Sequence, residues 1–160
     1  MSTITFSKHL ESDTLYLPEL LPFVGHRVEI VVRDSEPLPE RDASRRASMK
    51  TLRDICLRCE LANWDGEGAE AVSSETQDVA RRLLESLPNH LPWPTITAEP
   101  DGQLNLEWYQ APRRLLTASI APSGTLYWAA LIGSEDPRGS CQFADQFPQT
   151  LLYWIGQVYG

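Results

Sequence analysis

The chain has 160 residues, 42% of them hydrophobic, and carries a formal net charge of −8 at pH 7. That length and apolar content suit one ordinary domain with a small appendage. The acidic balance argues against binding to a nucleic-acid backbone by charge alone, and it favours basic partners.

The sequence also gives little indication of a membrane protein or a secreted protein. No run of about 18 apolar residues is present, so we expect no membrane-spanning segment. The start of the chain lacks the pattern of a secretory signal. Three cysteines make no disulfide framework, and we therefore expect a reducing, cytoplasmic environment.

Residues 1–33 predict a small β-rich module. Strand-like runs at 4–10, 14–20 and 28–32 alternate with turns, and none is long enough to bury a core by itself. Such a unit needs a second copy or another surface, so we expect a homodimer. Its apolar candidates for oligomerisation are Leu15, Leu17, Leu20, Val28, Ile30 and Val32.

Residues 34–48 are polar and mixed in charge, and they include two prolines. Too few apolar groups are present to offset the entropy of ordering, so this run predicts an exposed linker. The apolar and aromatic density rises from Met49 onward, and we place the main domain at 49–160.

Two helices are predicted at the start of that domain. Residues 49–62 carry Leu52, Ile55, Cys56 and Cys59 at helical spacing. The second helix has an apolar stripe made by Val79, Leu83, Leu84 and Leu87. Ser73 or Ser74 can cap its start, with Gln77 completing a capping box after Ser74, and Pro88 ends it.

Alternation of apolar and polar residues next predicts antiparallel strands joined by glycine-containing turns. They cover 95–98, 104–109, 115–120 and 125–131, with a short fifth strand around 140–143. A final helix begins near Asp145. The predicted fold class is α+β: an N-terminal β-hairpin module, two helices, a meander of four to five strands and a C-terminal helix.

The segments 12–20 and 24–32 resemble the short β-rich modules of AbrB-like and related type II bacterial antitoxins. The shared pattern is a hydrophobic strand, a Leu-Pro turn, and then Gly25 before a strand of the Val28-Glu29-Ile30 kind. The resemblance covers about a fifth of the chain. It implies a homodimer of intertwined hairpins and, in that family, binding to promoter DNA. Acidic residues oppose Lys8, Arg27 and Arg33 here, so we expect nucleic-acid binding to be weak or absent.

The main domain resembles an uncharacterised bacterial family that carries an Asn-Trp-Asp-Gly loop, here Asn63 to Gly66, followed by a meander. That resemblance supports the domain boundary and implies no activity.

The pair Cys56 and Cys59 forms a C-x-x-C within a predicted helix. One helical turn apart, the thiols suit a redox pair or half of a zinc site. However, no second ligand pair follows, and buried core cysteines are the interpretation we favour. We predict no metal or cofactor site.

The acidic loop from Trp64 to Glu70 is the best candidate for a functional loop. Asp65, Glu67 and Glu70 could hold a basic group or act as acid and base. In the structural alternative, Trp64 anchors the loop on the core and Asp65 makes a local turn bond.

Aromatic residues on the predicted strands suggest a second surface. Two pairs of adjacent aromatic residues occur there, Trp108 with Tyr109 and Tyr127 with Trp128. Because side chains alternate along a strand, one ring of each pair is expected in the core and the other outside. Exposed rings would anchor a protein interface, although ordinary core packing explains them as well. The predicted partner-binding residues are therefore Trp64, Asp65, Glu67, Glu70, Trp108, Tyr127 and Trp128.

From these features we expect a non-enzymatic protein of antitoxin type that binds and restrains a protein partner such as a cognate toxin. Two alternatives stay open. One is a subunit or sensor of a larger bacterial defence or regulatory complex. The other is a hydrolase-like enzyme that uses the Trp64–Glu70 loop. We assign no catalytic residue.

Overall fold

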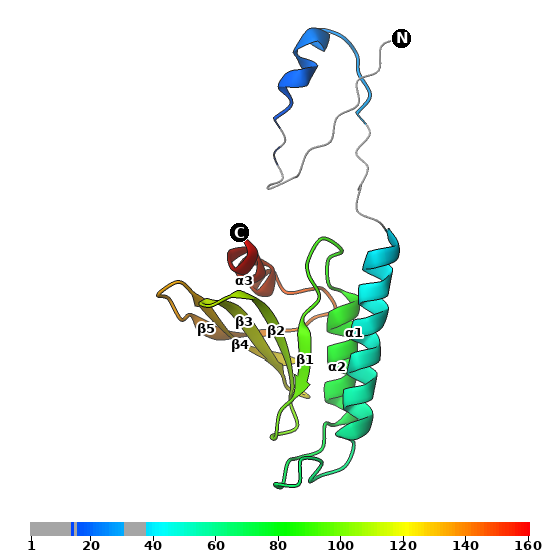
Figure 1. Ribbon diagram of the computed structural model, residues 1–160, viewed down its shortest axis with the longest axis vertical. Helices are drawn as coiled ribbons and strands as arrows, with labels where there is room; N and C mark the ends of the chain where they lie inside the picture. Colours follow the sequence, from blue (N-terminus) through cyan, green and yellow to red (C-terminus); the bar gives the residue numbers. More distant parts are fainter. Residues whose placement is uncertain (1–13, 15, 31–37) are drawn as a thin grey trace. The chain divides into compact units, whose positions relative to one another are not determined.

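The computed structural model describes residue 14 and residues 16–30 and 38–160, and the chain divides into two units, Met1–Ser35 and Glu36–Gly160 (Figure 1). No helix among the described residues is both long enough and apolar enough to cross a membrane.

In the N-terminal unit, the described residues contain one short 3₁₀-helix, η1, at Pro18–Phe23. The strand predicted over 14–20 is therefore wrong where it can be checked, and residues 27–30 form no strand either. Pro18 and Pro22 explain the difference, because a fixed φ and a missing N–H favour a tight turn over a sheet ladder. No hairpin is present among the described residues, and the strand predicted at 4–10 lies outside them.

The second unit opens with helix α1, Leu38–Arg58. Residues 38–48 are thus helical, whereas the sequence predicted an exposed linker over 34–48 and a helix only from Met49. Residues 42–47 are exposed, as predicted. Ala43, Arg45, Arg46 and Ala47 are good helix formers, and adding turns to a helix already anchored by its packed end costs little.

Helix α2, Ser74–Glu85, confirms the apolar stripe and one of the two predicted caps. The capping box predicted for Ser74 and Gln77 is not formed, because Gln77 Nε2 donates to the Val72 carbonyl at 3.0 Å. Ser73 is the N-cap, because its hydroxyl accepts a hydrogen bond from the Thr76 amide at 3.2 Å. The apolar stripe is buried, and Leu83 and Leu84 have no exposed surface. The helix ends where Ser86 Oγ donates to the Leu83 carbonyl, two residues before Pro88.

A five-stranded antiparallel meander follows, in the order β1-β2-β3-β4-β5, as predicted. Its strands are β1 Thr95–Ala98, β2 Leu104–Ala111, β3 Arg114–Ile120, β4 Thr125–Ile132 and β5 Arg138–Gln142. Gly102 and Gly124 occupy turn positions with φ of 79° and 81°, which explains the glycine at each. Helix α3, Gln149–Tyr159, closes the fold and begins four residues after the predicted start at Asp145.

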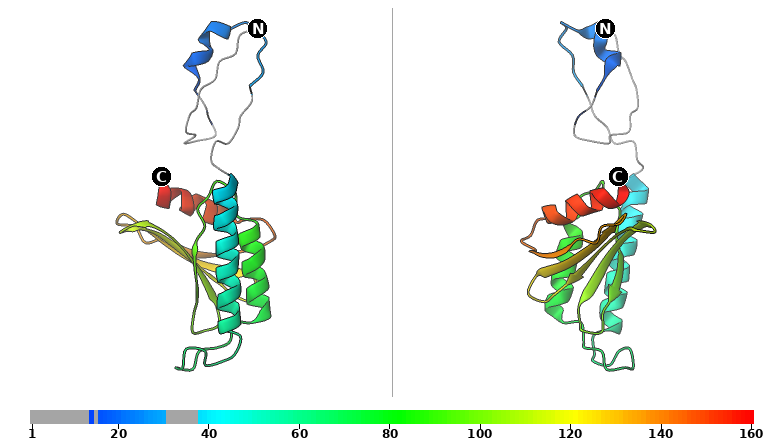
Figure 2. Two further views of the ribbon diagram at one scale, coloured as in Figure 1. Left: turned by 45° about the vertical axis from the view of Figure 1, so that its right-hand side comes forward. Right: turned by 90° about the vertical axis from the view of Figure 1, so that its left-hand side faces the viewer.

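All three helices pack on one face of the sheet (Figure 2). That inner face carries side chains with no exposed surface: Leu104, Leu106, Leu116, Ala118, Ile120 and Leu126. The alternate residues form the outer face, and among residues 38–160 no helix lies against it. One-sided burial of this kind is typical of antiparallel sheets.

Trp108 belongs to the inner face and is 1% exposed. Its indole N–H donates to the Pro92 carbonyl at 3.0 Å, and its ring meets Phe147 edge-on. The prediction that Trp108 binds a partner is therefore wrong. Its neighbour Tyr109 is the exposed member of the pair, at 54%.

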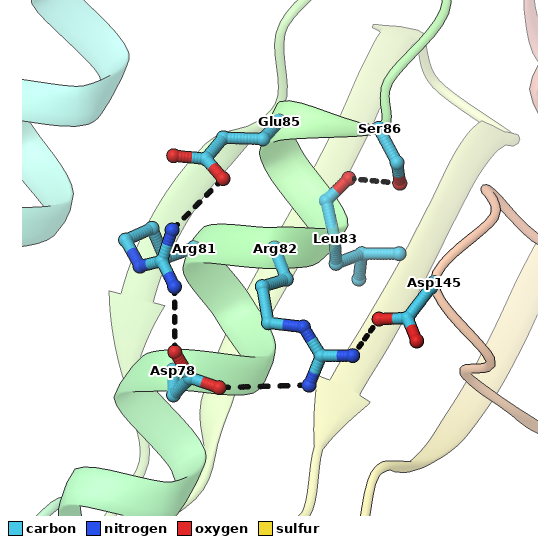
Figure 3. Close-up of polar contacts among 7 residues, drawn as sticks. All are labelled: Asp78, Arg81, Arg82, Leu83, Glu85, Ser86 and Asp145. Atoms are coloured by element: carbon cyan, nitrogen blue, oxygen red, sulfur yellow. Dashed lines mark hydrogen bonds and ion pairs between the residues drawn. The ribbon is translucent and has the colours of Figure 1, made fainter.

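Arg82 joins α2 to the segment that follows β5 (Figure 3). Its guanidinium pairs with Asp145 and with Asp78, and it lies 5.5 Å from the centre of the Phe143 ring. The ion pair with Asp145 and the cation–π contact with Phe143 thus connect α2 to the chain that leads into α3, whereas the pair with Asp78 lies within α2.

We expect Trp108→Phe to lower the free energy of unfolding by about 1–3 kcal/mol, because it leaves a cavity and an unpaired Pro92 carbonyl. Tyr109→Phe is the matched control and should change it by less than about 0.5 kcal/mol. Urea unfolding followed by circular dichroism measures both. Equal effects of the two substitutions would contradict the assignment of Trp108 to the core.

Candidate functional site

The acidic loop folds back on itself through its own backbone. The Asn63 amide donates to the Ala69 carbonyl, and the Gly68 amide donates to Asn63 Oδ1 at 2.8 Å. Asn63 itself has a φ of 64°, a conformation that asparagine tolerates better than most residues. These bonds close the loop into a small, rigid turn.

Asp65 completes that turn. Its Oδ1 accepts from the amides of Glu67, at 2.8 Å, and Ala69, at 3.0 Å. These two backbone hydrogen bonds lower the pKa of Asp65 below the ordinary value for an aspartate. A carboxylate that stays ionised and serves two amides is poorly suited to act as a general acid near neutral pH. The structural alternative therefore accounts for Asp65.

The loop docks on the turn between β1 and β2. Trp64 is partly buried against the core, and its indole N–H donates to the Glu70 carbonyl at 2.8 Å. The Glu70 amide in turn donates to the Pro100 carbonyl at 2.7 Å. Gly102 leaves room for this approach, because a Cβ there would lie 2.7 Å from the Ala71 carbonyl oxygen. Trp64 is thus a structural anchor, and the carboxylates of Glu67 and Glu70 stay on the outside.

Docking brings two acidic segments together. Glu67 and Glu70 come from the loop, and Glu99 and Asp101 come from the β1–β2 turn. No lysine or arginine lies between Arg58 and Arg81, or between Arg82 and Arg113, so neither segment supplies a cation of its own. We name these four carboxylates the acidic end of the second unit.

The acidic end continues onto the outer face of the sheet. Ser119 Oγ on β3 donates to the Glu99 carboxylate at 3.2 Å, and Ser119 pairs with Tyr127 on β4. A shallow hollow of about 390 Å³ lies here. The outer-face side chains around it are Thr117, Ser119, Tyr127, Ala129 and Arg138. Sequence reasoning missed Thr117, Ser119 and Arg138, although the alternation along the strands places them on the same face as Tyr127.

Tyr127 and Trp128, neighbours on β4, lie on opposite faces of the sheet. Tyr127 is 53% exposed on the outer face. Trp128 points to the inner face, where its ring lies 5.5 Å from that of Trp154 on α3. The predicted partner-binding set is therefore split. Asp65, Glu67, Glu70 and Tyr127 lie on the outside, whereas Trp64, Trp108 and Trp128 pack against the fold.

A second groove, of about 460 Å³, lies between α2 and the β3–β4 turn. Asp78, Arg82, Ser123 and Phe143 are among the residues that line it. Because the Arg82 guanidinium is already paired with Asp78 and Asp145, the groove offers no unpaired cation from this arginine to an anionic ligand.

Cys56 and Cys59 are both buried in the core, in agreement with the interpretation we favoured. Burial raises the pKa of each thiol, so both stay protonated and unreactive near neutral pH. In the described part of the chain, no three side chains of the types His, Cys, Asp and Glu come together as metal ligands.

The predicted oligomerisation residues lie in the N-terminal unit. Val28 and Ile30 are 46% and 57% exposed, and Leu17 and Leu20 are partly buried around η1. Leu15 and Val32 lie outside the described residues. The described part of this unit also exposes Leu21 and Val24.

Comparison with family models, with curated proteins and with solved structures found no match to this chain. The function proposed below therefore depends on the geometry of the described residues.

The Asp65 carboxylate should make the loop sensitive to acid. Because its pKa is lower in the folded state, the stabilisation it gives is complete above about pH 5 and is lost as the pH falls through that lowered pKa. Asp65→Asn should remove this dependence and speed hydrogen exchange at the Glu67 and Ala69 amides. Glu67→Gln is the control of equal charge change, since no loop bond uses its carboxylate. Identical acid profiles for wild type and Asp65→Asn would contradict the role given to Asp65.

Proposed function

We propose that this chain is a non-enzymatic interaction protein that binds and restrains a basic protein partner, in the manner of an antitoxin. The binding surface in this proposal joins the acidic end to the outer face around Tyr127. The observation that carries it is the one-sided sheet. Its inner face is fully committed to the core, and its outer face is left open beside four carboxylates.

Charge supports a basic partner. Glu67, Glu70 and Asp101 are exposed, and the Glu99 carboxylate already accepts one hydrogen bond from a neutral hydroxyl. Lysine and arginine side chains would add charge-assisted bonds to the same oxygens. The long-range field of a chain with net charge −8 would also speed the encounter at low salt.

Tyrosine at the centre of the surface supports a protein rather than a small ligand. Tyr127 combines a large apolar ring with a hydroxyl, and residues of this type often dominate binding energy at interfaces. The hollow beside it is shallow, whereas sites for small molecules usually enclose most of the ligand.

The finer part of the proposal is a homodimer formed by the N-terminal unit. Its support is the exposure of Leu21, Val24, Val28 and Ile30 in a unit where none of the described side chains is buried. A dimer would present two binding surfaces to a partner and raise avidity without new contacts.

The test is a charge-reversal pair on the tagged full-length chain, expressed in its source organism. Glu67→Lys with Glu70→Lys should abolish retention of the partner, and rising salt should weaken retention by wild type. Asp42→Lys with Glu135→Lys is the matched control, because it makes the same charge change away from the acidic end. Asp42 is exposed near the start of α1, and Glu135 lies in the β4–β5 turn, which the meander places at the opposite end of the sheet from the β1–β2 turn.

The antitoxin part has its own readout. A protein retained by wild type and by the control, but not by the loop variant, should slow growth when expressed alone, and co-expression of wild-type chain should restore growth. The proposal would be overturned if wild type, the loop variant and the control all retained the same proteins. It would also be overturned if wild type retained no protein.

A further inference from the structure

We propose that the free edge of β5 pairs with the same edge of a second copy, joining the two meanders into one continuous ten-stranded sheet. This inference is independent of the partner proposed above and of the N-terminal unit. It concerns the backbone edge of the last strand of the sheet, Arg138–Gln142, rather than the side chains of the outer face.

Among the residues that the structure describes, strand β5 pairs on one side with β4 and has no strand on its other side. Its pairing with β4 is flanked by two bonds, from the Phe143 amide to the Gly124 carbonyl and from the Ala130 amide to the Pro137 carbonyl. Bonded pairs in an antiparallel ladder alternate, so Gly139 and Cys141 also turn their backbone groups toward β4. The N–H and C=O groups of Arg138, Ser140 and Gln142 therefore point away from the sheet.

The two edges of the sheet are protected to different degrees. At the other edge, β1 has only four residues, and Pro92, Pro94 and Pro100 stand close to its ends. Helix α1 also packs beside it. Strand β5 contains no proline, and four of its five residues are exposed. An unblocked edge of this kind is a template for another strand.

A second copy fits because the open positions are self-complementary. With a two-fold axis at Ser140, Ser140 faces its own copy and Arg138 faces Gln142, so no like charges oppose each other. The two Arg138 residues are four positions apart along the strands, or about 13 Å, which is beyond the screening length at physiological salt. The backbone N–H and C=O groups of Arg138, Ser140 and Gln142 can therefore bond to the same groups of a second, antiparallel copy.

The inner-face residues fit the same register. Gly139 would face Cys141 of the other copy in a non-bonded pair, where side chains come closest. A Cβ on Gly139 would lie 2.9 Å from the Trp128 ring, so that ring already fills the space a side chain would need. Cys141 is small enough to face it. On the outer face, the hollow around Tyr127 in each copy would lie beside the joined β5 strands, because Arg138 is one of the residues that line it.

Cysteine crosslinking on the full-length chain tests both the pairing and its register. In a Cys141→Ser background, Ser140→Cys should form a covalent dimer under mild oxidation, because paired Cα atoms about 5.5 Å apart allow a disulfide. Arg138→Cys and Gln142→Cys should stay uncrosslinked singly but crosslink in combination. Thr117→Cys, on the outer face of the central strand β3, is the control.

Crosslinking of Thr117→Cys to the same extent, or a monomeric Ser140→Cys, would overturn the proposal. A dimer that forms only through the N-terminal unit would leave Ser140→Cys without a crosslink.

A proline variant supplies an independent measurement. Ser140→Pro removes an N–H that points away from β4, so the fold should survive, as judged by circular dichroism and urea unfolding. The Kd for self-association through this edge should rise about ten- to a hundredfold, because two symmetric hydrogen bonds are lost. Ser140→Thr keeps the N–H and is the matched control. Unchanged self-association in a folded Ser140→Pro variant would contradict pairing at this edge.

Discussion

The burial of one face of the meander under three helices is the constraint on which the rest of the second unit depends. Leu104, Leu106, Leu116, Ile120 and Leu126 reach zero exposure only because α1, α2 and α3 all cover the same side. Side chains alternate along a strand, so this choice also decides every residue of the other side. The open face and the hollow around Tyr127 are consequences of that single arrangement.

Within the acidic loop, some residues hold the loop in place and others expose their carboxylates to solvent. Asn63, Trp64 and Asp65 give their polar groups to the loop itself and to its docking on the β1–β2 turn. Glu67 and Glu70 are held outward by that framework and use none of its bonds for their carboxylates. A rigid loop with its charges presented in this way loses little conformational entropy when it binds a partner.

Much of the second unit could be predicted from the sequence because its signals are local. The turns at Gly102 and Gly124, the cap at Ser73 and the alternation along β2 to β4 each depend on residues a few positions apart. The start of α1 was missed because its first turns carry no apolar stripe, and their helicity comes from the packed turns that follow. Trp108 was assigned to the wrong side because alternation reveals two faces but not which of them the helices cover. Thr117 and Ser119, which lie near Tyr127, were not predicted for a related reason. Threonine and serine carry no functional signal in the sequence, and only the paired strands bring them together on one face.

The connectivity of the sheet also bears on how the chain folds. Each strand pairs with its neighbour in sequence, so the meander consists of local contacts that can form quickly. Helix α3 is different, because Leu151, Ile155 and Val158 cover strands synthesised well before it. Until α3 has left the ribosome, the finished sheet exposes part of its leucine-rich side to the cell. The nascent chain therefore passes through a stage in which a chaperone can bind where α3 will later pack.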